Sequence, residues 1–384
     1  MEFEFATATR ILFGRGRLRE MGALARSFGA RALIVTGRDK TRAHALQPIL
    51  TAAGVSSTFF QLGGEPTVHD VRAGARLAKE ERCDQVIGYG GGSALDAAKA
   101  IAALLTNAGD LLDYLEVIGA AKPLPSPAAP CLAIPTTAGT GTEVTRNSVL
   151  ASPEHRFKVS LRSPFLLPKI ALVDPELSVG LPPALTATTG LDALTQLIEP
   201  YVSHRANPLT DGFCVEGLRR VGRSLRRAFE HGADFPARED MSLAALLSGL
   251  ALANAALGAV HGFAAPLGGM YSGPHGGFCA ALLPHAMEVN LRALREREPN
   301  NPALARYGEV ARLLTDNPVA EAEAGLAWIR ELCATLDVPR LQVYGVKAED
   351  FPELIEKAAK ASSMKGNPIR LTADELVDIL RNAL

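Results

Sequence analysis

An excess of charge of either sign is absent from this sequence. Its 384 residues include 40 lysines and arginines against 41 aspartates and glutamates, a formal net charge of −1. Proteins that bind nucleic acid or anionic membranes through charge carry a clear basic excess. The composition therefore argues against both partners. We interpret the arginine-rich stretch 219–227 as the solvated face of a helix.

Cysteine is scarce, and long apolar runs are missing. The cysteines are odd in number, scattered and without CxxC spacing, so neither a disulfide framework nor a zinc ribbon is expected: Cys83, Cys131, Cys214, Cys279 and Cys333. This usage favours a reducing cytoplasm. No apolar run reaches the ~18 residues of a membrane-spanning helix, and the opening MEFEFATATR does not resemble a signal peptide.

The sequence has two kinds of periodicity instead. Before about residue 180, short apolar runs alternate with helical patterns, with strands predicted at 32–37, 55–62, 84–90 and from 131, and helices at 41–53 and 68–81. Such alternation predicts βαβ units around a parallel sheet. Beyond it, apolar residues recur only at helical spacing. We predict an α/β dinucleotide-binding domain at 1–180 and a helical metal and substrate domain at 181–384, with the site in the cleft between them.

A glycine turn closes the predicted strand at 84–90. Gly90, Gly91 and Gly92 precede a helix that begins near Ser93, so the backbone can approach a pyrophosphate at the helix N-terminus. The motif is neither GxGxxG nor a Walker A loop, and a plain tight turn capped by Ser93 is the alternative. A second polar turn follows the strand from 131 and offers hydroxyls to the same ligand, although it could simply cap that strand: Thr136, Thr137 and Thr140.

The end of the first apolar strand bears on the choice of dinucleotide. Gly37 removes bulk there, and Arg38 offers a guanidinium suited to the 2′-phosphate of NADP(H). Asp39 would instead suit the ribose of NAD. We favour NADP(H) over NAD on the strength of Arg38.

Four side chains could together hold a divalent transition metal. Asp192 and Gln196 are four residues apart, on one face of a predicted helix, and His261 and His275 each precede a glycine that we expect to interrupt a helix. Asp192 is the stronger evidence for a metal site, because a buried carboxylate is costly unless a cation pairs with it. The histidine pair alone could be structural. The remaining histidines receive no role: His44, His69, His155, His204, His231 and His285.

Over nearly its whole length the chain resembles the iron-containing (group III) alcohol dehydrogenases, in the motifs GGGSALDAAKA, IPTTAGTGTEVT, GLDAL, HGFAAPLGG, PHGG and LLPH. The resemblance implies a dehydroquinate synthase-like fold, a Rossmann-like domain followed by a helical bundle, and a homodimer. It also implies a cofactor pocket formed by Gly91, Gly92, Ser93, Asp96, Thr136, Thr137, Thr140 and Lys158. The family's metal ligands, one aspartate and three histidines, fall on Asp192, Gln196, His261 and His275.

The chain departs from the family pattern at two positions. Gln196 stands where the family usually has a histidine ligand, so we expect weaker ion binding or a different ion, with iron and zinc both open. Ala265 stands where well-known members carry a histidine given a proton-relay role, so that relay cannot be assumed.

These observations predict an NAD(P)-dependent, metal-assisted dehydrogenase that interconverts a small alcohol and its aldehyde or ketone, with catalytic roles for Asp192, His261 and His275. One alternative is a metal-independent reductase similar to maleylacetate reductase, which Gln196 favours and Asp192 opposes. A lyase-like relative of the dehydroquinate synthase branch would need a basic cluster that 181–285 hardly offers. A dinucleotide-binding protein without activity is the third alternative.

Overall fold

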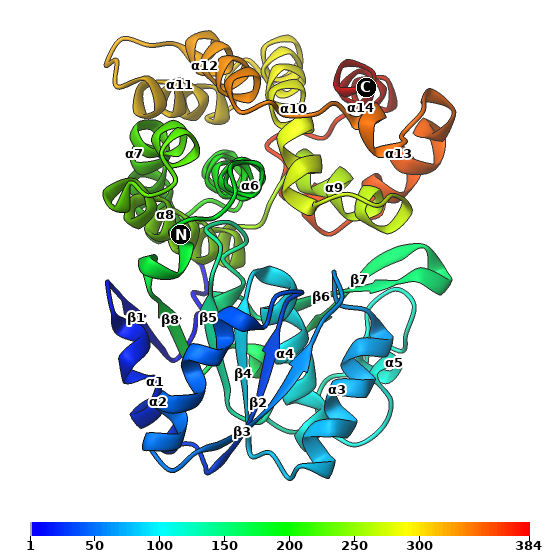
Figure 1. The fold of residues 1–384 in the computed structure, drawn as a ribbon. Coiled ribbons are helices and arrows are strands. Elements are labelled where there is room, and N and C mark those ends of the chain that lie inside the picture. The colour runs from blue at the N-terminus through cyan, green and yellow to red at the C-terminus, as the bar shows by residue number, and fades with distance from the viewer. Residues whose placement is uncertain (1) are drawn as a thin grey trace. The chain divides into compact units, whose positions relative to one another are not determined.

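The structure is a computed structural model that describes residues 2–384, and these form two compact units (Figure 1). One unit comprises Phe5–Thr137 and Gly141–Ser178. The other comprises Val179–Leu384 with residues 2–4 and Ala138–Thr140. The division between Ser178 and Val179 lies beside the boundary predicted after residue 180.

The first unit is built on a parallel sheet of six strands. Their order across the sheet is β1 (Arg10–Phe13), β8 (Ile170–Val173), β5 (Cys131–Pro135), β4 (Gln85–Gly90), β2 (Arg31–Thr36) and β3 (Ser56–Gln61). Because β3 lies on one side of β2 and β4 on the other, the strand order reverses at β2. In open α/β sheets, ligands bind at the carboxyl ends of the strands beside such a reversal.

Helices cover both faces of this sheet, as the sequence predicts. They are α1 (Met21–Arg26), α2 (Leu46–Ala52), α3 (Val68–Glu80), α4 (Gly92–Thr106) and α5 (Leu111–Tyr114). Alternate residues of a strand point to opposite faces. Accordingly Ile34 shares a buried core with Met21 of α1 and Leu46 of α2, whereas its neighbour Leu33 shares another with Ile101 of α4.

A small antiparallel hairpin in the first unit was not predicted. It pairs β6 (Asn147–Ser152) with β7 (Phe157–Arg162), and the residues of β6 alternate between buried and partly buried. Polar residues separate the few apolar residues of the hairpin, so the sequence has no apolar run from which its strands could be predicted. The hairpin carries Lys158, one of the predicted cofactor residues.

The second unit is all helical within the described chain. Its helices are α6 (Pro183–Val202), α7 (Pro208–Glu230), α8 (Phe235–Ala255), α9 (Ala259–Met270), α10 (His275–Arg297), α11 (Ala303–Thr315), α12 (Ala322–Thr335), α13 (Phe351–Lys360) and α14 (Ala373–Ala383). The predicted combination of an α/β half with a helical half, the dehydroquinate synthase-like arrangement, is confirmed.

The apolar stretch 241–269 has helical spacing throughout, and the structure breaks it at Ala256, before the interruption expected at Gly262. Ala256 has a φ of 64°, which no helix accommodates, and α8 and α9 meet at an angle of 99°. Among residues 2–384 no single helix is long and apolar enough to cross a membrane. Only α8 and α9 taken together reach that length and composition, and they form a bent pair. After the break, α9 starts beside α6, where Val260 and His261 contact Glu199.

Candidate functional site

Asp192 is a buried carboxylate in the middle of α6. Nearly every neighbour on this helix is buried, and Asp192 itself is only 1% exposed. Its Oδ1 atom has no hydrogen-bond partner. A buried carboxylate oxygen without a donor is costly, so this atom is suited to pair with a cation.

His261 and His275 lie in the first turns of two helices. His261 belongs to the first turn of α9, and His275 is the first residue of α10. The expectation that the His-Gly dipeptides interrupt helices is therefore wrong, because both lie where a helix begins. Gly276 has a packing role, since a Cβ there would lie 2.2 Å from the carbonyl oxygen of Thr188 on α6.

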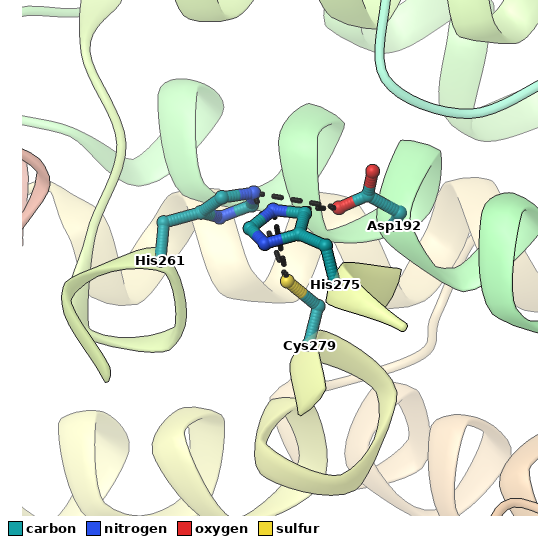
Figure 2. A group of neighbouring side chains, drawn as sticks. All are labelled: Asp192, His261, His275 and Cys279. Atoms are coloured by element: carbon teal, nitrogen blue, oxygen red, sulfur yellow. Dashed lines mark hydrogen bonds and ion pairs between the residues drawn. The ribbon is translucent and has the colours of Figure 1, made fainter. Parts of the chain in front are cut away.

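The three side chains converge on one point, together with Cys279 (Figure 2). The Nε2 atoms of His261 and His275 lie 3.5 and 3.7 Å from Oδ1 of Asp192. The sulfur of Cys279 lies 3.9 and 3.7 Å from the same two nitrogens. These four ligand-type atoms all lie within 4.8 Å of one another, and the partly exposed side chain of His275 leaves one side of the cluster accessible.

Glu199 orients His261 from behind. Its Oε2 accepts a hydrogen bond from Nδ1 of His261 over 2.7 Å, and its Oε1 accepts one from the backbone N–H of Val260, also over 2.7 Å. The carboxylate thus ties α6 to the start of α9 and directs Nε2 of His261 toward Asp192. Sequence reasoning missed Glu199, although it lies seven residues after Asp192, two turns along the same helix face.

Mutual electrostatic stabilisation sets the charge of the cluster. Burial opposes ionisation of Asp192, but His275 and His261 outweigh it and lower the pKa of that carboxyl group. Burial also opposes protonation of His261, yet the carboxylates of Glu199 and Asp192 outweigh it and raise the pKa of the imidazole. Burial raises the pKa of the Cys279 thiol to about 12.

Gln196, the remaining predicted ligand, makes a hydrogen bond within the helical unit. The hydroxyl of Ser248 on α8 donates to Oε1 of Gln196 over 2.9 Å. Cys279, in contrast, received no role from the sequence, because its relation to His275 depends on where α10 begins. Its spacing of four residues after His275 is the signal that could have found it.

The glycine turn lies where β4 passes into α4. Gly90 has a φ of 157°, Gly91 precedes the helix, and α4 begins at Gly92. A Cβ on Gly91 would lie 3.2 Å from Oγ1 of Thr137, so the turns after β4 and β5 are in close contact. Ser93 lies in the first turn of α4 but does not cap it, because no side-chain capping hydrogen bond is present.

The second polar turn is divided between the two units. The backbone N–H of Thr136 donates to the carbonyl of Gly90 over 2.9 Å, which places Thr136 and Thr137 beside the glycine turn. Thr140 belongs instead with the helical unit. Lys158 is buried on β7 and forms an ion pair with Glu65.

Asp96 lies one turn into α4 and is buried. Burial raises its pKa to about 6, against the opposing effect of Lys99, whose Nζ lies 3.4 Å from Oδ1 of Asp96. Lys99 also donates to the carbonyl of Thr142 over 3.0 Å and to the hydroxyl of Thr145 over 3.0 Å. The pair therefore anchors the loop after β5 against α4, and the predicted contact of Asp96 with a cofactor stays a prediction.

Gly37 and Arg38 follow β2, the strand at which the sheet order reverses. Arg38 is exposed, and its Nε donates to the carbonyl of Gly63 over 2.6 Å. Asp39 accepts hydrogen bonds from both the backbone N–H and the hydroxyl of Thr41, and the hydroxyl contributes most to lowering the pKa of its carboxyl group.

Comparison with known proteins supports this interpretation of both units. The profile described as "Iron-containing alcohol dehydrogenase" matches residues 8–175, and "Fe-containing alcohol dehydrogenase family, C-terminal" matches residues 186–384. Alcohol dehydrogenase 4 of Schizosaccharomyces pombe is 38% identical over 383 residues, covering 97% of this chain and 87% of that protein. The NAD-dependent methanol dehydrogenase of Bacillus methanolicus is 33% identical over 384 residues, covering 97% of each chain.

A solved structure, "Crystal structure analysis of 1,3-propanediol oxidoreductase", superposes with a TM-score of 0.91 at 35% identity over 100% of both chains. With a glycine turn on a parallel sheet and a buried cluster of ligand-type side chains, the protein is an oxidoreductase of the class that acts on CH–OH groups. It belongs to the iron-containing alcohol dehydrogenase family.

Proposed function

We propose that this protein reversibly oxidises a small alcohol to its aldehyde or ketone with NAD(P) as the hydride acceptor and a bound divalent metal ion. Asp192, His261 and His275 are the core of the metal site and the catalytic residues. The observation that carries the proposal is the Oδ1 atom of Asp192, which is buried, lacks a hydrogen bond and lies 3.5 and 3.7 Å from two imidazole nitrogens. Carboxylate and imidazole are ligands that suit iron(II) and zinc alike.

A divalent ion in this position would polarise the substrate oxygen and stabilise the negative charge that develops on it. The chain's own residues hold the site in place. Glu199 fixes the ring of His261, and the close approach of Gly276 to Thr188 positions His275 against Asp192. Ala265 has no side chain that could relay a proton, so we assign acceptance of the alcohol proton to a water molecule or a cofactor ribose hydroxyl.

The dinucleotide would bind at the carboxyl ends of β2, β4 and β5. Gly90, Gly91 and Gly92 allow close approach of a pyrophosphate to the N-terminus of α4, which no side chain caps. Ser93, Asp96, Thr136, Thr137, Thr140 and Lys158 complete the proposed pocket. Nicotinamide supplies the hydride chemistry itself.

We assign NADP(H) as the preferred dinucleotide because of the residues that follow β2. The carboxylate of Asp39 already accepts two hydrogen bonds from Thr41, so it is less available to bind a ribose hydroxyl. Arg38 presents an exposed guanidinium beside Gly37. A homodimer and a reducing cytoplasmic location are further parts of the proposal, the latter supported by five free cysteines.

The test is an assay of protein purified without chelators, with NADH and NADPH against a panel of small aldehydes and ketones. We expect turnover that disappears when the metal is removed and returns when it is added back, while dinucleotide binding persists throughout. Asp192→Asn should lose both metal and activity. Undiminished activity in verified metal-free protein would instead establish a metal-independent reductase, and absence of turnover across the panel would overturn the proposal.

A further inference from the structure

We propose that Cys279, rather than Gln196, is the fourth metal ligand, and that its thiolate makes the site select zinc over iron(II). The proposal rests on the metal site of the proposed function and revises its ligand set. It concerns which atoms hold the ion, whichever alcohol the enzyme uses.

The position of Cys279 on α10 places its sulfur on the same face as His275. The two residues are four apart on one helix, so their side chains lie one above the other. Cys279 is fully buried, and Figure 2 shows its side chain directed toward the two imidazole rings. Its sulfur therefore faces the centre of the cluster.

Four of the donor–donor distances in the cluster lie close to those around a single tetrahedral ion. Zinc bonds of about 2.0–2.3 Å with tetrahedral angles would place ligand atoms roughly 3.3–3.8 Å apart. The Nε2 atoms of His261 and His275 lie 3.5 and 3.7 Å from Oδ1 of Asp192, and 3.9 and 3.7 Å from the sulfur of Cys279. These distances exceed those of good hydrogen bonds but suit atoms that share an ion.

Gln196 is a poorer candidate for the same role. Its amide oxygen already accepts a hydrogen bond from the hydroxyl of Ser248, 2.9 Å away. An amide oxygen is also neutral, whereas a thiolate brings a negative charge to the ion. In this chain, Cys279 supplies the anionic donor that Gln196 cannot.

The donor set predicts the identity of the ion. One thiolate, two imidazoles and one carboxylate combine a soft donor, two borderline donors and a hard one. The thiolate favours zinc, for which such sites also have a higher intrinsic affinity than for iron(II). The ion binds the cysteine as thiolate, and its proton passes to solvent. Zinc can expand to five ligands, so four protein ligands leave room for a substrate oxygen.

The test uses the full chain expressed with zinc and iron both in excess and purified without chelators. We expect elemental analysis to find zinc in preference to iron. Zinc X-ray absorption should then show a sulfur neighbour at about 2.3 Å beside nitrogen and oxygen neighbours at about 2.0–2.1 Å. Wild-type protein with no sulfur neighbour would overturn the assignment of Cys279, and a preference for iron would overturn the selection of zinc.

Variants identify which side chain supplies the sulfur. Cys279→Ser should lose the sulfur neighbour, and its zinc affinity should fall by at least about 100-fold. Losing only a hydrogen-bond partner of a ligand costs less than this. Cys214→Ser, at an equally buried cysteine on α7, is the matched control and should behave as wild type. Gln196→Ala should keep both the sulfur neighbour and the zinc. An unchanged spectrum in Cys279→Ser would contradict the proposal. Loss of zinc in Gln196→Ala would contradict it as well.

Cobalt substitution provides a measurement that needs no variant and no substrate. Wild-type protein loaded with Co²⁺ should show a sulfur-to-cobalt charge-transfer band, and its absence would count against a thiolate ligand. Because none of these measurements requires turnover, a sulfur-ligated zinc in a protein inactive toward every alcohol would sink the proposed function while leaving this inference intact.

Discussion

Nδ1 of His261 donates a hydrogen bond to Oε2 of Glu199 over 2.7 Å, and this contact joins α9 to α6 inside the helical unit. Since one ring nitrogen is held by the carboxylate, the other is directed at Asp192. Partners of this kind fix the tautomer and orientation of a metal-binding imidazole. Glu199 therefore acts as a positioning residue.

Glu199→Gln should weaken metal binding by about 10–100-fold, the usual effect of losing such a partner. Both groups that Glu199 contacts are donors, the Nδ1–H of His261 and the N–H of Val260, so the amide NH₂ of glutamine must face one of them. Competition against a chelator of known affinity measures the change. Glu230→Gln, at the exposed end of α7, is the control, and equal affinities in the two variants would refute the role of Glu199.

Gly276→Ala should destabilise the protein and displace His275. The new Cβ would lie 2.2 Å from the carbonyl oxygen of Thr188 and 3.2 Å from Cβ of Asp192, so α10 must move away from α6. Overpacking of this kind costs about 1–3 kcal/mol. Thermal unfolding and metal content check both effects.

The matched control for that substitution is Gly212→Ala. Gly212 also lies in a helix, but a Cβ there meets no atom within 4 Å, and alanine should stabilise the helix by up to about 1 kcal/mol. If Gly276→Ala unfolded at the wild-type temperature with full metal content, the close packing of α10 on α6 would not be what positions His275.

Glu143→Gln should stabilise the protein above neutral pH. Burial raises the pKa of the Glu143 carboxyl group from 4.5 to about 7, so the unfolded chain loses this proton at a lower pH than the folded protein does. The contribution of this carboxyl group to stability therefore falls between about pH 4.5 and pH 7 and is constant above that window. The variant should match wild type near pH 4.5 and exceed it by up to about 3 kcal/mol above pH 7.

Thermal midpoints of both proteins across this pH range provide the measurement. Glu154→Gln, at an exposed glutamate farther along the same segment, should show no such pH-dependent difference. A constant gap between Glu143→Gln and wild type at every pH would mean that the carboxyl group does not titrate in the folded protein within this window.

Arg38→Ala should shift the cofactor preference toward NADH. A lost charged hydrogen bond to phosphate costs about 1.5–3 kcal/mol, which corresponds to a loss of at least about 10-fold in kcat/KM for NADPH. The kcat/KM for NADH should stay unchanged. Arg26→Ala on α1 removes another exposed guanidinium that contacts a backbone carbonyl, and it should leave both values unchanged. An unaltered ratio in Arg38→Ala would remove the argument for NADP(H).

Local patterns were sufficient to predict the two halves of the fold and the glycine turn. The strand at 84–90 and the turn at Gly90 could be predicted because apolar runs and glycines act over a few residues. The hairpin of β6 and β7 could not, because its alternation is weak. Nor could the break at Ala256, because alanine ordinarily favours a helix and gives no local signal for a φ of 64°.

For the cluster around Asp192, the sequence by itself determined which ligand-type side chains are available, a carboxylate on one helix and two histidines before glycines. Only the tertiary structure decided which side chains meet. Glu199 lies 62 residues from His261, and Cys279 lies 18 residues from it, so their contacts with His261 join different helices and do not follow from local spacing. The packing of α6, α9 and α10 brings these atoms together, because burial of their apolar faces sets the positions of the few polar groups between them.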